Sequence, residues 1–229
     1  MPTSFYRFTT FDQNDFNWLT RVTDRDGDGY GVRFRYLSAF CPRCGKFDQD
    51  TVFEKGFENT CARIRVRKGR NILETDDDFL CVSSDLLKSL NSAGVKGFES
   101  KPLYTGIYWH ILRITNRRRF DPNVYRTDEK PCSACQRVGD YGSIQNEREI
   151  DLPNEELTFF STDRQRGQGG YDLFVTEKLS EVLRNSNAKG GDLYRLWTAD
   201  EEKRLKDNPK WRRKDGGFSL GQHRYGPTD

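Results

Sequence analysis

Four of the six cysteines occur as two pairs with the same spacing. Cys41 and Cys44 enclose Pro-Arg, and Cys132 and Cys135 enclose Ser-Ala. The tight turn of a Cys-x-x-Cys pair directs both sulfur atoms inward, and a structural zinc ion takes four such ligands at tetrahedral corners. The sequence therefore predicts one structural zinc site built from Cys41, Cys44, Cys132 and Cys135. Four cysteine ligands leave no open coordination position, so the metal is not expected to be catalytic.

The flanking residues bear on the geometry of each turn. Pro42 presets a φ that suits the turn, and Gly45 tolerates a positive φ beside the metal. Gln136 stands where a glycine is expected after the second pair. The alternatives to a shared metal are a redox-active pair or buried thiols. A redox pair normally opens a helix after a strand, and Cys44-Gly-Lys-Phe-Asp does not resemble such a helix.

The acidic segment 24–29 resembles the opening of a calcium loop. Asp24, Asp26 and Asp28 stand at its first, third and fifth positions, and Gly29 follows at the sixth. The twelfth position would be Arg35, where calcium needs a bidentate glutamate. We interpret the segment as an acidic hairpin turn, with calcium binding as the alternative.

Two basic clusters could hold phosphate groups. The first contains Arg113, Arg117, Arg118 and Arg119, and the second is the run 210–214 (KWRRK). Such patches can bind nucleic acid, but clusters of this size are more often solvated faces or partners of acidic side chains. Binding to nucleic acid is therefore kept as the alternative function.

The sequence does not indicate catalytic chemistry. Its two histidines are His110, within an apolar segment, and His223, near the end of the chain. No P-loop or nucleophile-elbow pattern is present. His110 is interpreted as a satisfied strand residue, and Cys81 and Cys61 as core residues. The protein is expected not to be an enzyme.

The bulk composition is that of a polar, folded protein. Hydrophobic residues make up 34%, charged residues 32% and aromatic residues 13% of the 229 residues. Disordered chains contain few aromatics, and a net charge of +3 is small for a dedicated nucleic-acid binder. No signal peptide or membrane span is evident. A cytoplasmic location is expected, and there cysteines serve more often as metal ligands than as disulfides.

The elements that would position the cysteines follow from hydrophobic patterning. Alternation predicts strands at 30–36 and 61–67, and the apolar segment 107–115 is interpreted as a buried strand. The apolar run 79–82 leads into a helix with Leu86, Leu87 and Leu90 on one face. Ser83 or Ser84 is expected to cap that helix, and Gly94 and Gly97 to end it.

The second half of the sequence repeats this order. An apolar run at 173–175 is followed by Thr176 as a cap, a helix with Leu179, Val182 and Leu183, and a stop at Gly190 and Gly191. Aligning residues 80–97 with residues 173–190 gives an offset of 93, and the two cysteine pairs are offset by 91. The pattern indicates an internal repeat; the alternative is that any two strand–cap–helix units look alike.

Together these features predict an α+β fold with antiparallel or mixed sheets, in which two similar strand–helix halves are joined by the zinc knuckle pair. A zinc-pinned domain is expected over 1–197, with pseudo-repeats at 30–105 and 125–197. A charged C-terminal helix and tail, with the helix at 199–207, is expected over 198–229.

The order of these motifs resembles the bacterial double-CxxCG family. The likeness covers roughly residues 30–197 and rests on CPRCG, LCVSSDLLKSLNSAGVKGFESKPL, PCSAC and YDLFVTEKLSEVL. Some members of that family are immunity proteins of polymorphic toxin systems, which bind a partner toxin and block it. The resemblance implies a non-enzymatic protein that neutralises a cognate toxin and contains a fixed metal. Abundant aromatic and arginine residues suit a protein interface.

Overall fold

The structure is a computed structural model of the full chain. It describes residues 4–10, 19–23, 30–57, 69–75, 77–103, 108–121, 132–137, 144–163, 170–208 and 217–220, of which residues 21–23, 30 and 217–220 are described by their backbone alone. The predicted strand at 61–67, the acidic segment 24–29 and the basic run 210–214 lie outside these residues.

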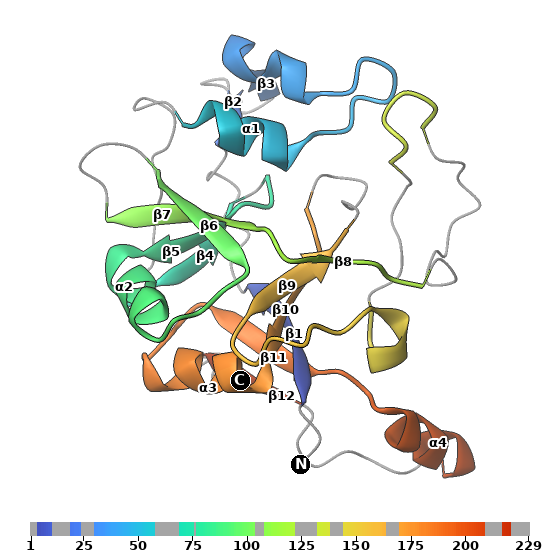
Figure 1. The fold of residues 1–229 in the computed structure, drawn as a ribbon. Coiled ribbons are helices and arrows are strands. Elements are labelled where there is room, and N and C mark those ends of the chain that lie inside the picture. Colours follow the sequence, from blue (N-terminus) through green and yellow to red (C-terminus); the bar gives the residue numbers. More distant parts are fainter. Residues whose placement is uncertain are drawn as a thin grey trace, which may run out of the picture.

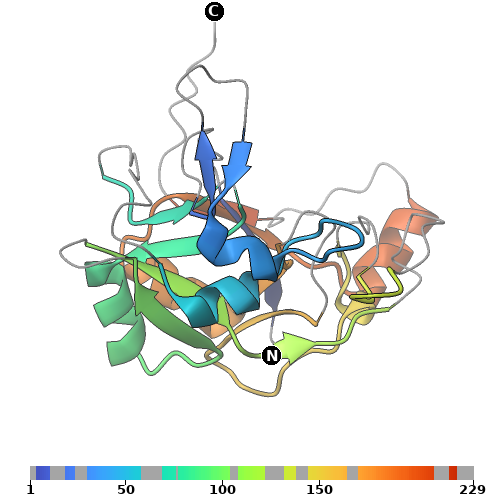
Figure 2. The same cartoon turned by 90° about the horizontal axis from the view of Figure 1, so that it is seen from above.

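The described strands form two main sheets and a hairpin (Figure 1). The smaller sheet has the order β4 (Ile72–Glu74), β5 (Leu80–Ser83), β7 (Trp109–Ile114) and β6 (Phe98–Pro102). The larger sheet has the order β12 (Gly217–Leu220), β11 (Gly191–Arg195), β1 (Phe5–Thr10), β10 (Leu173–Thr176), β9 (Phe159–Thr162) and β8 (Arg117–Arg118). Strands β2 (Arg21–Thr23) and β3 (Tyr30–Val32) form the hairpin, which stands out from the body of the molecule (Figure 2). Pairing is antiparallel except between β8 and β9, so the predicted α+β class with mixed sheets is confirmed.

Four α-helices and two 3-10 helices are described. The α-helices are α1 (Gln49–Lys55), α2 (Ser84–Ser92), α3 (Glu177–Asn185) and α4 (Ala199–Asp207), and the 3-10 helices are η1 (Phe34–Ala39) and η3 (Glu147–Glu149). The predicted helix at 199–207 is confirmed by α4, which begins with a capping box formed by Thr198 and Glu201.

The caps of α2 and α3 differ although both helices follow a strand directly. The Ser83 side chain accepts a hydrogen bond from the backbone of Leu86, as predicted. Thr176 stands at the corresponding position but makes no side-chain cap. Its hydroxyl instead donates to the carbonyl of Glu156, at 2.7 Å. Thr176 is thus the N-cap residue of α3, as predicted, but its side chain does not cap the helix because its hydroxyl donates to the neighbouring loop.

The predicted strand over 30–36 is shorter in the structure. β3 ends at Val32, and η1 begins two residues later at Phe34. Residues 34 and 36 would lie on the same face of a strand. In the structure Tyr36 is buried while Phe34 is 90% exposed, as the 3-10 helix allows.

Four strands of the larger sheet pair in the same order as the four strands of the smaller sheet. β9, β10, β1 and β11 correspond to β4, β5, β7 and β6. Strand β10, helix α3 and strand β11 each begin and end 93 residues after β5, α2 and β6. The registers also agree, because Leu80 lies opposite Leu112 and Leu173 opposite Phe8. The third strand of each set differs in its place in the sequence. In the smaller sheet β7 directly follows β6, whereas in the larger sheet β1 lies near the N-terminal end of the chain.

The two sets of strands are also joined by matching backbone contacts. The Ile72 N–H donates to the Lys189 carbonyl at 3.0 Å, and the Phe159 N–H donates to the Lys96 carbonyl at 3.1 Å. Gly97 and Gly190 follow these lysines, and both have positive φ. A Cβ on either glycine would lie 2.1 Å from a carbonyl oxygen of the opposite set. These positions therefore require glycine.

The largest hydrophobic core lies where the two sheets and helices α2 and α3 meet. It includes Leu86 and Leu90 from α2, Leu179 and Leu183 from α3, and Phe8 from β1. A second core lies under α1 and η1, and a third includes Phe5, Phe160 and Phe174. Among the described helices, none is both long enough and apolar enough to cross a bilayer.

Candidate metal centre

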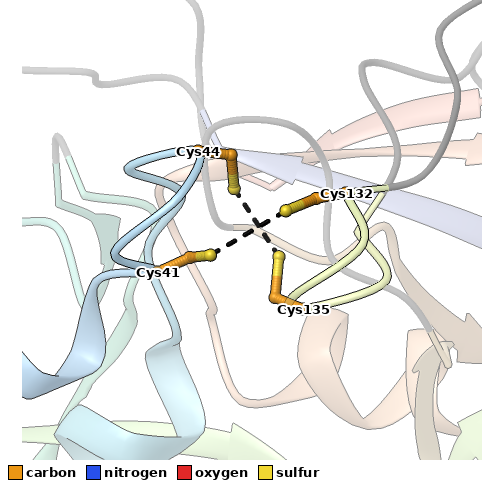
Figure 3. A group of neighbouring side chains, drawn as sticks. All are labelled: Cys41, Cys44, Cys132 and Cys135. Carbon is orange, nitrogen blue, oxygen red and sulfur yellow. Dashed lines mark hydrogen bonds between the residues drawn. The ribbon is translucent and has the colours of Figure 1, made fainter.

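The four predicted ligands lie together at the junction of two loops (Figure 3). Their ligating atoms are all within 4.8 Å of one another. The Sγ atoms of Cys41 and Cys132 are 3.9 Å apart, and those of Cys44 and Cys135 are 3.6 Å apart. These two contacts cross in the view of Figure 3. Each loop supplies two thiols to one group that could hold a metal ion.

Both loops have the same backbone. In the first, the Cys41 N–H donates to the Lys46 carbonyl and the Gly45 N–H donates to the Cys41 carbonyl, both at 2.8 Å. In the second, the equivalent bonds from Cys132 to Arg137 and from Gln136 to Cys132 are 2.9 and 2.7 Å long.

Gln136 reproduces the turn that its glycine counterpart forms. Its φ is 57°, close to the 68° of Gly45. The lack of a glycine after the second pair therefore leaves the geometry of the turn unchanged, although glutamine adopts this left-handed conformation less readily than glycine.

Side chains from beyond the cysteines hold the loops together. The Arg137 guanidinium donates to the Phe47 carbonyl and lies 3.4 Å from the carboxylate of Asp48. It therefore ties the second loop to the segment that follows the first. Phe47 packs in turn against Phe40, with ring centroids 5.1 Å apart, and belongs to the core under α1. Sequence reasoning missed Arg137, because a single arginine after a cysteine pair carries no local signature.

The thiols differ in acidity. Backbone N–H groups of Cys135 and Ala134 donate to the Cys132 sulfur and lower its pKa to about 6. The same kind of donation, from Cys44 and Arg43, lowers the pKa of Cys41. Partial desolvation and hydrogen bonds to the other thiols raise the pKa of Cys44 to about 11, although its side chain is exposed. Each turn thus directs N–H groups at the first cysteine of its pair and lowers the pKa of that thiol.

Neither Cys81 nor His110 belongs to the group of four thiols. Cys81 is fully buried in the core under α1, as predicted, and burial raises its pKa well above the usual range. His110 is half-buried and its Nε2 lies 3.0 Å from the Ser84 hydroxyl. Desolvation lowers the pKa of His110, so the ring is neutral near pH 7. Cys61 and His223 lie outside the described residues.

Three arginines of the first basic cluster, Arg113, Arg117 and Arg118, contact acidic side chains. Arg113 pairs with Glu54 and Glu99. Arg117 pairs with Asp50 at 3.1 Å, and Arg118 with Glu155 at 3.0 Å. Much of the positive charge in this cluster is therefore balanced within the protein.

One buried carboxylate connects two segments that are distant in the sequence. Asp77 is 5% exposed and accepts hydrogen bonds from the backbone of Leu19 and Thr20 and from the hydroxyls of Thr20 and Thr75. Desolvation raises its pKa. Asp77 stands in the run Asp76-Asp77-Asp78, and nothing in that run indicates partners 57 and 58 residues away.

Comparison with known protein families gave no matching family, and no curated protein matched the chain.

Proposed function

We propose that Cys41, Cys44, Cys132 and Cys135 hold a structural zinc ion in a non-enzymatic protein that binds a protein partner, as an immunity protein binds its cognate toxin. The convergence of four thiols carries the first part of this proposal. In a tetrahedral site with Zn–S bonds near 2.3 Å, sulfur atoms would be roughly 3.8 Å apart. The distances of 3.9 and 3.6 Å fit that value.

A site with four cysteines is closed to substrate, so the ion stabilises the fold and does not act on a ligand. Metal analysis of the purified protein is expected to find one zinc per chain, and removal of the metal to lower the melting temperature. Substoichiometric metal after purification under reducing conditions with added zinc would contradict the assignment.

The chain is best explained as two copies of a unit in which a strand, a cysteine knuckle and a β–β–α–β segment follow one another. The first unit runs from β1 to β6 and the second from β7 to β11. Each unit gives its first strand to the other's sheet, which accounts for the matching registers and the matching contacts between the two sets. These boundaries differ from the pseudo-repeats expected at 30–105 and 125–197, which omit β1.

Protein binding is supported by large apolar side chains on the surface. Phe34 is 90% exposed and Leu37 51% exposed, both on η1 just before the first knuckle. Tyr108 and Tyr194 are about half exposed. Exposed aromatic side chains of this kind are common at protein interfaces. We infer from the resemblance to the double-CxxCG family that this protein partner is a toxin.

The alternative, a zinc-containing nucleic-acid-binding protein, has no comparable support among the described residues. Of the residues on which it depended, Arg113, Arg117 and Arg118 pair with carboxylates, Arg119 is exposed, and the run 210–214 lies outside the described residues. A steep dependence of DNA or RNA binding on salt would be its required signature.

The partner can be tested with the protein encoded beside this chain. Expressed alone, that neighbouring protein should arrest growth, and coexpression with this chain should restore growth and yield a copurifying complex. A neighbouring protein that is toxic yet neither blocked nor bound would refute the immunity role.

A further inference from the structure

A hollow of about 190 Å³ lies on the larger sheet, beside strands β1 and β11. Its lining residues are Arg7, Ile144, Gln145, Tyr194, Arg195, Leu196 and Trp197. Arg7 and Tyr194 lie opposite each other in the pairing of β1 with β11. Because side chains alternate along a strand, Arg7 shares a face with Phe5, which packs in the third core.

The corresponding face of the smaller sheet is covered by helix α1. In the smaller sheet, Ile111 of β7 pairs with Lys101 of β6. This pair has the same position in the register as Arg7 and Tyr194 in the larger sheet, so Ile111 corresponds to Arg7 and Lys101 to Tyr194. Phe53 of α1 packs in this core and is 1% exposed. The Lys101 ammonium donates to the Phe53 carbonyl at 2.8 Å and lies 4.7 Å from the centre of its ring.

Of the segment after the second knuckle that corresponds to α1, only the end is described, because residues 138–143 lie outside the described residues. Ile144 follows Phe53 by 91 residues, the offset of the two knuckles, and it is fully buried in the third core. The described part of that segment continues into η3, a 3-10 helix of three residues. Tyr194 is 48% exposed. Among the described residues, the larger sheet thus has a hollow beside the place that α1 covers in the smaller sheet.

The charge of the hollow indicates what would fill it. The Nε atom of Arg7 is buried and has no hydrogen-bond partner among the described residues. The guanidinium lies 5.9 Å from the centre of the Tyr194 ring. In α1, the residue after Phe53 is Glu54, which pairs with Arg113 while the Arg113 guanidinium lies 4.7 Å from the Phe53 ring. On the smaller sheet, this face therefore binds an aromatic side chain next to a carboxylate. By register Arg113 corresponds to Thr9, and in the hollow the positive charge is supplied by Arg7, two residues away on the same face.

We propose that the hollow around Arg7 and Tyr194 binds a short amphipathic helix of the protein partner, which presents an aromatic residue beside an acidic one. This proposal rests on the protein-binding function proposed above and names the surface and the chemistry of the partner. Insertion of a helix into an apolar groove is a common mode of recognition. Tyr, Trp and Arg, all present here, are the residues most often found at the energetic centre of an interface.

A peptide tests the hollow without knowledge of the partner. The probe is a helix-stapled peptide that copies residues 48–57 and so carries Phe53 and Glu54. Titration into the full-length, zinc-loaded protein is expected to change the fluorescence of Trp197 and to saturate. Tyr194→Ala should weaken binding at least tenfold, whereas Tyr108→Ala, which removes an equally exposed tyrosine elsewhere, should not. To assign the signal, Trp197→Phe should abolish the fluorescence change.

Three results would overturn the proposal: no saturable binding, equal binding to the Tyr194→Ala variant, or unchanged binding of a peptide in which the glutamate is replaced by lysine. The neighbour-encoded protein gives a second measurement. If it binds the wild-type chain and the Tyr194→Ala variant equally, the hollow is not the docking site although the protein-binding function stands. If it does not bind the wild-type chain, the immunity role fails. The peptide titration alone then determines whether the hollow binds a helix.

Discussion

At the level of single residues, the acidity of the cysteines couples the stability of the fold to pH. The fold lowers the pKa of Cys132 from 9.0 to about 6. Its contribution to stability is therefore complete above about pH 9 and is lost as the pH falls towards 6. Zinc acts in the same direction on all four thiols, because only thiolates are ligands. We expect the melting temperature of the zinc-loaded protein to fall steeply from about pH 8 to about pH 5.

The control for this pH dependence is the same protein treated with a chelator. Its melting temperature should be lower at neutral pH and should change less over the same range. Scanning calorimetry at each pH measures both. Equal slopes for the two forms would show that metal ligation by the thiols does not cause the pH dependence.

The turns after the two cysteine pairs offer a matched exchange of residues. Gln136 and Gly45 both have positive φ, which costs a residue with a Cβ about 1–2 kcal/mol. Gln136→Gly is expected to raise the free energy of unfolding by about 0.5–1 kcal/mol, after the entropy cost of glycine. Gly45→Ala is expected to lower it by about 1 kcal/mol, from backbone strain alone, because a Cβ there would meet no atom within 4 Å. Denaturant unfolding at fixed zinc concentration measures both, and changes of the opposite sign would contradict the strain argument.

The residues of the site show what a sequence can reveal. The spacing alone identified the four cysteines, because a Cys-x-x-Cys turn places two thiols where a tetrahedral zinc site needs them. The same spacing could not identify Arg137 or Asp77, since their roles depend on carbonyls and N–H groups from distant segments. Such partners become visible only when the chain is folded.

At the level of elements, Gly97 and Gly190 mark the points where the two sets of strands touch. A Cβ at either position would lie 2.1 Å from a carbonyl oxygen, that of Phe159 or that of Ile72. Gly97→Ala and Gly190→Ala are each expected to destabilise the protein by about 3 kcal/mol or more, because backbone would have to move. Gly94→Ala is the control: its φ is also positive but its Cβ would meet nothing, so a loss of about 1 kcal/mol is expected. Equal losses at all three positions would show that strain, and not contact, determines the cost.

The strand–helix units were predictable from the sequence, and their pairing was not. The apolar run at 79–82, the cap at Ser83 and the spacing of Leu86 and Leu90 are local signals, and they located β5 and α2. Alternation in β1 specifies which side chains face a core, but not which strand lies beside it. The insertion of β1 between β10 and β11 therefore had no signal that a single sequence could carry.

At the level of the whole molecule, the proposed exchange of first strands and the shared metal have one consequence. In this proposed arrangement, each unit supplies one inner strand of the other unit's sheet, β1 or β7, and two of the four thiols. The largest core also draws side chains from both units, including Leu86 and Leu179. Neither unit can complete its sheet, its core or its metal site alone.

A chain divided between Leu103 and Tyr108, which separates β6 from β7, should therefore reassemble from its two fragments. We expect a tagged N-terminal fragment to copurify with the C-terminal fragment in equal amounts and with one zinc per pair. Cys132→Ser with Cys135→Ser in the second fragment should weaken the association at least tenfold, because the metal would lose half of its ligands. Cys81→Ser, which alters a core thiol away from the metal, should leave the zinc content of the pair unchanged. If each fragment folded alone with its own zinc, or if the pair assembled equally well without the metal, exchange of strands around a shared ion would be the wrong description of this protein.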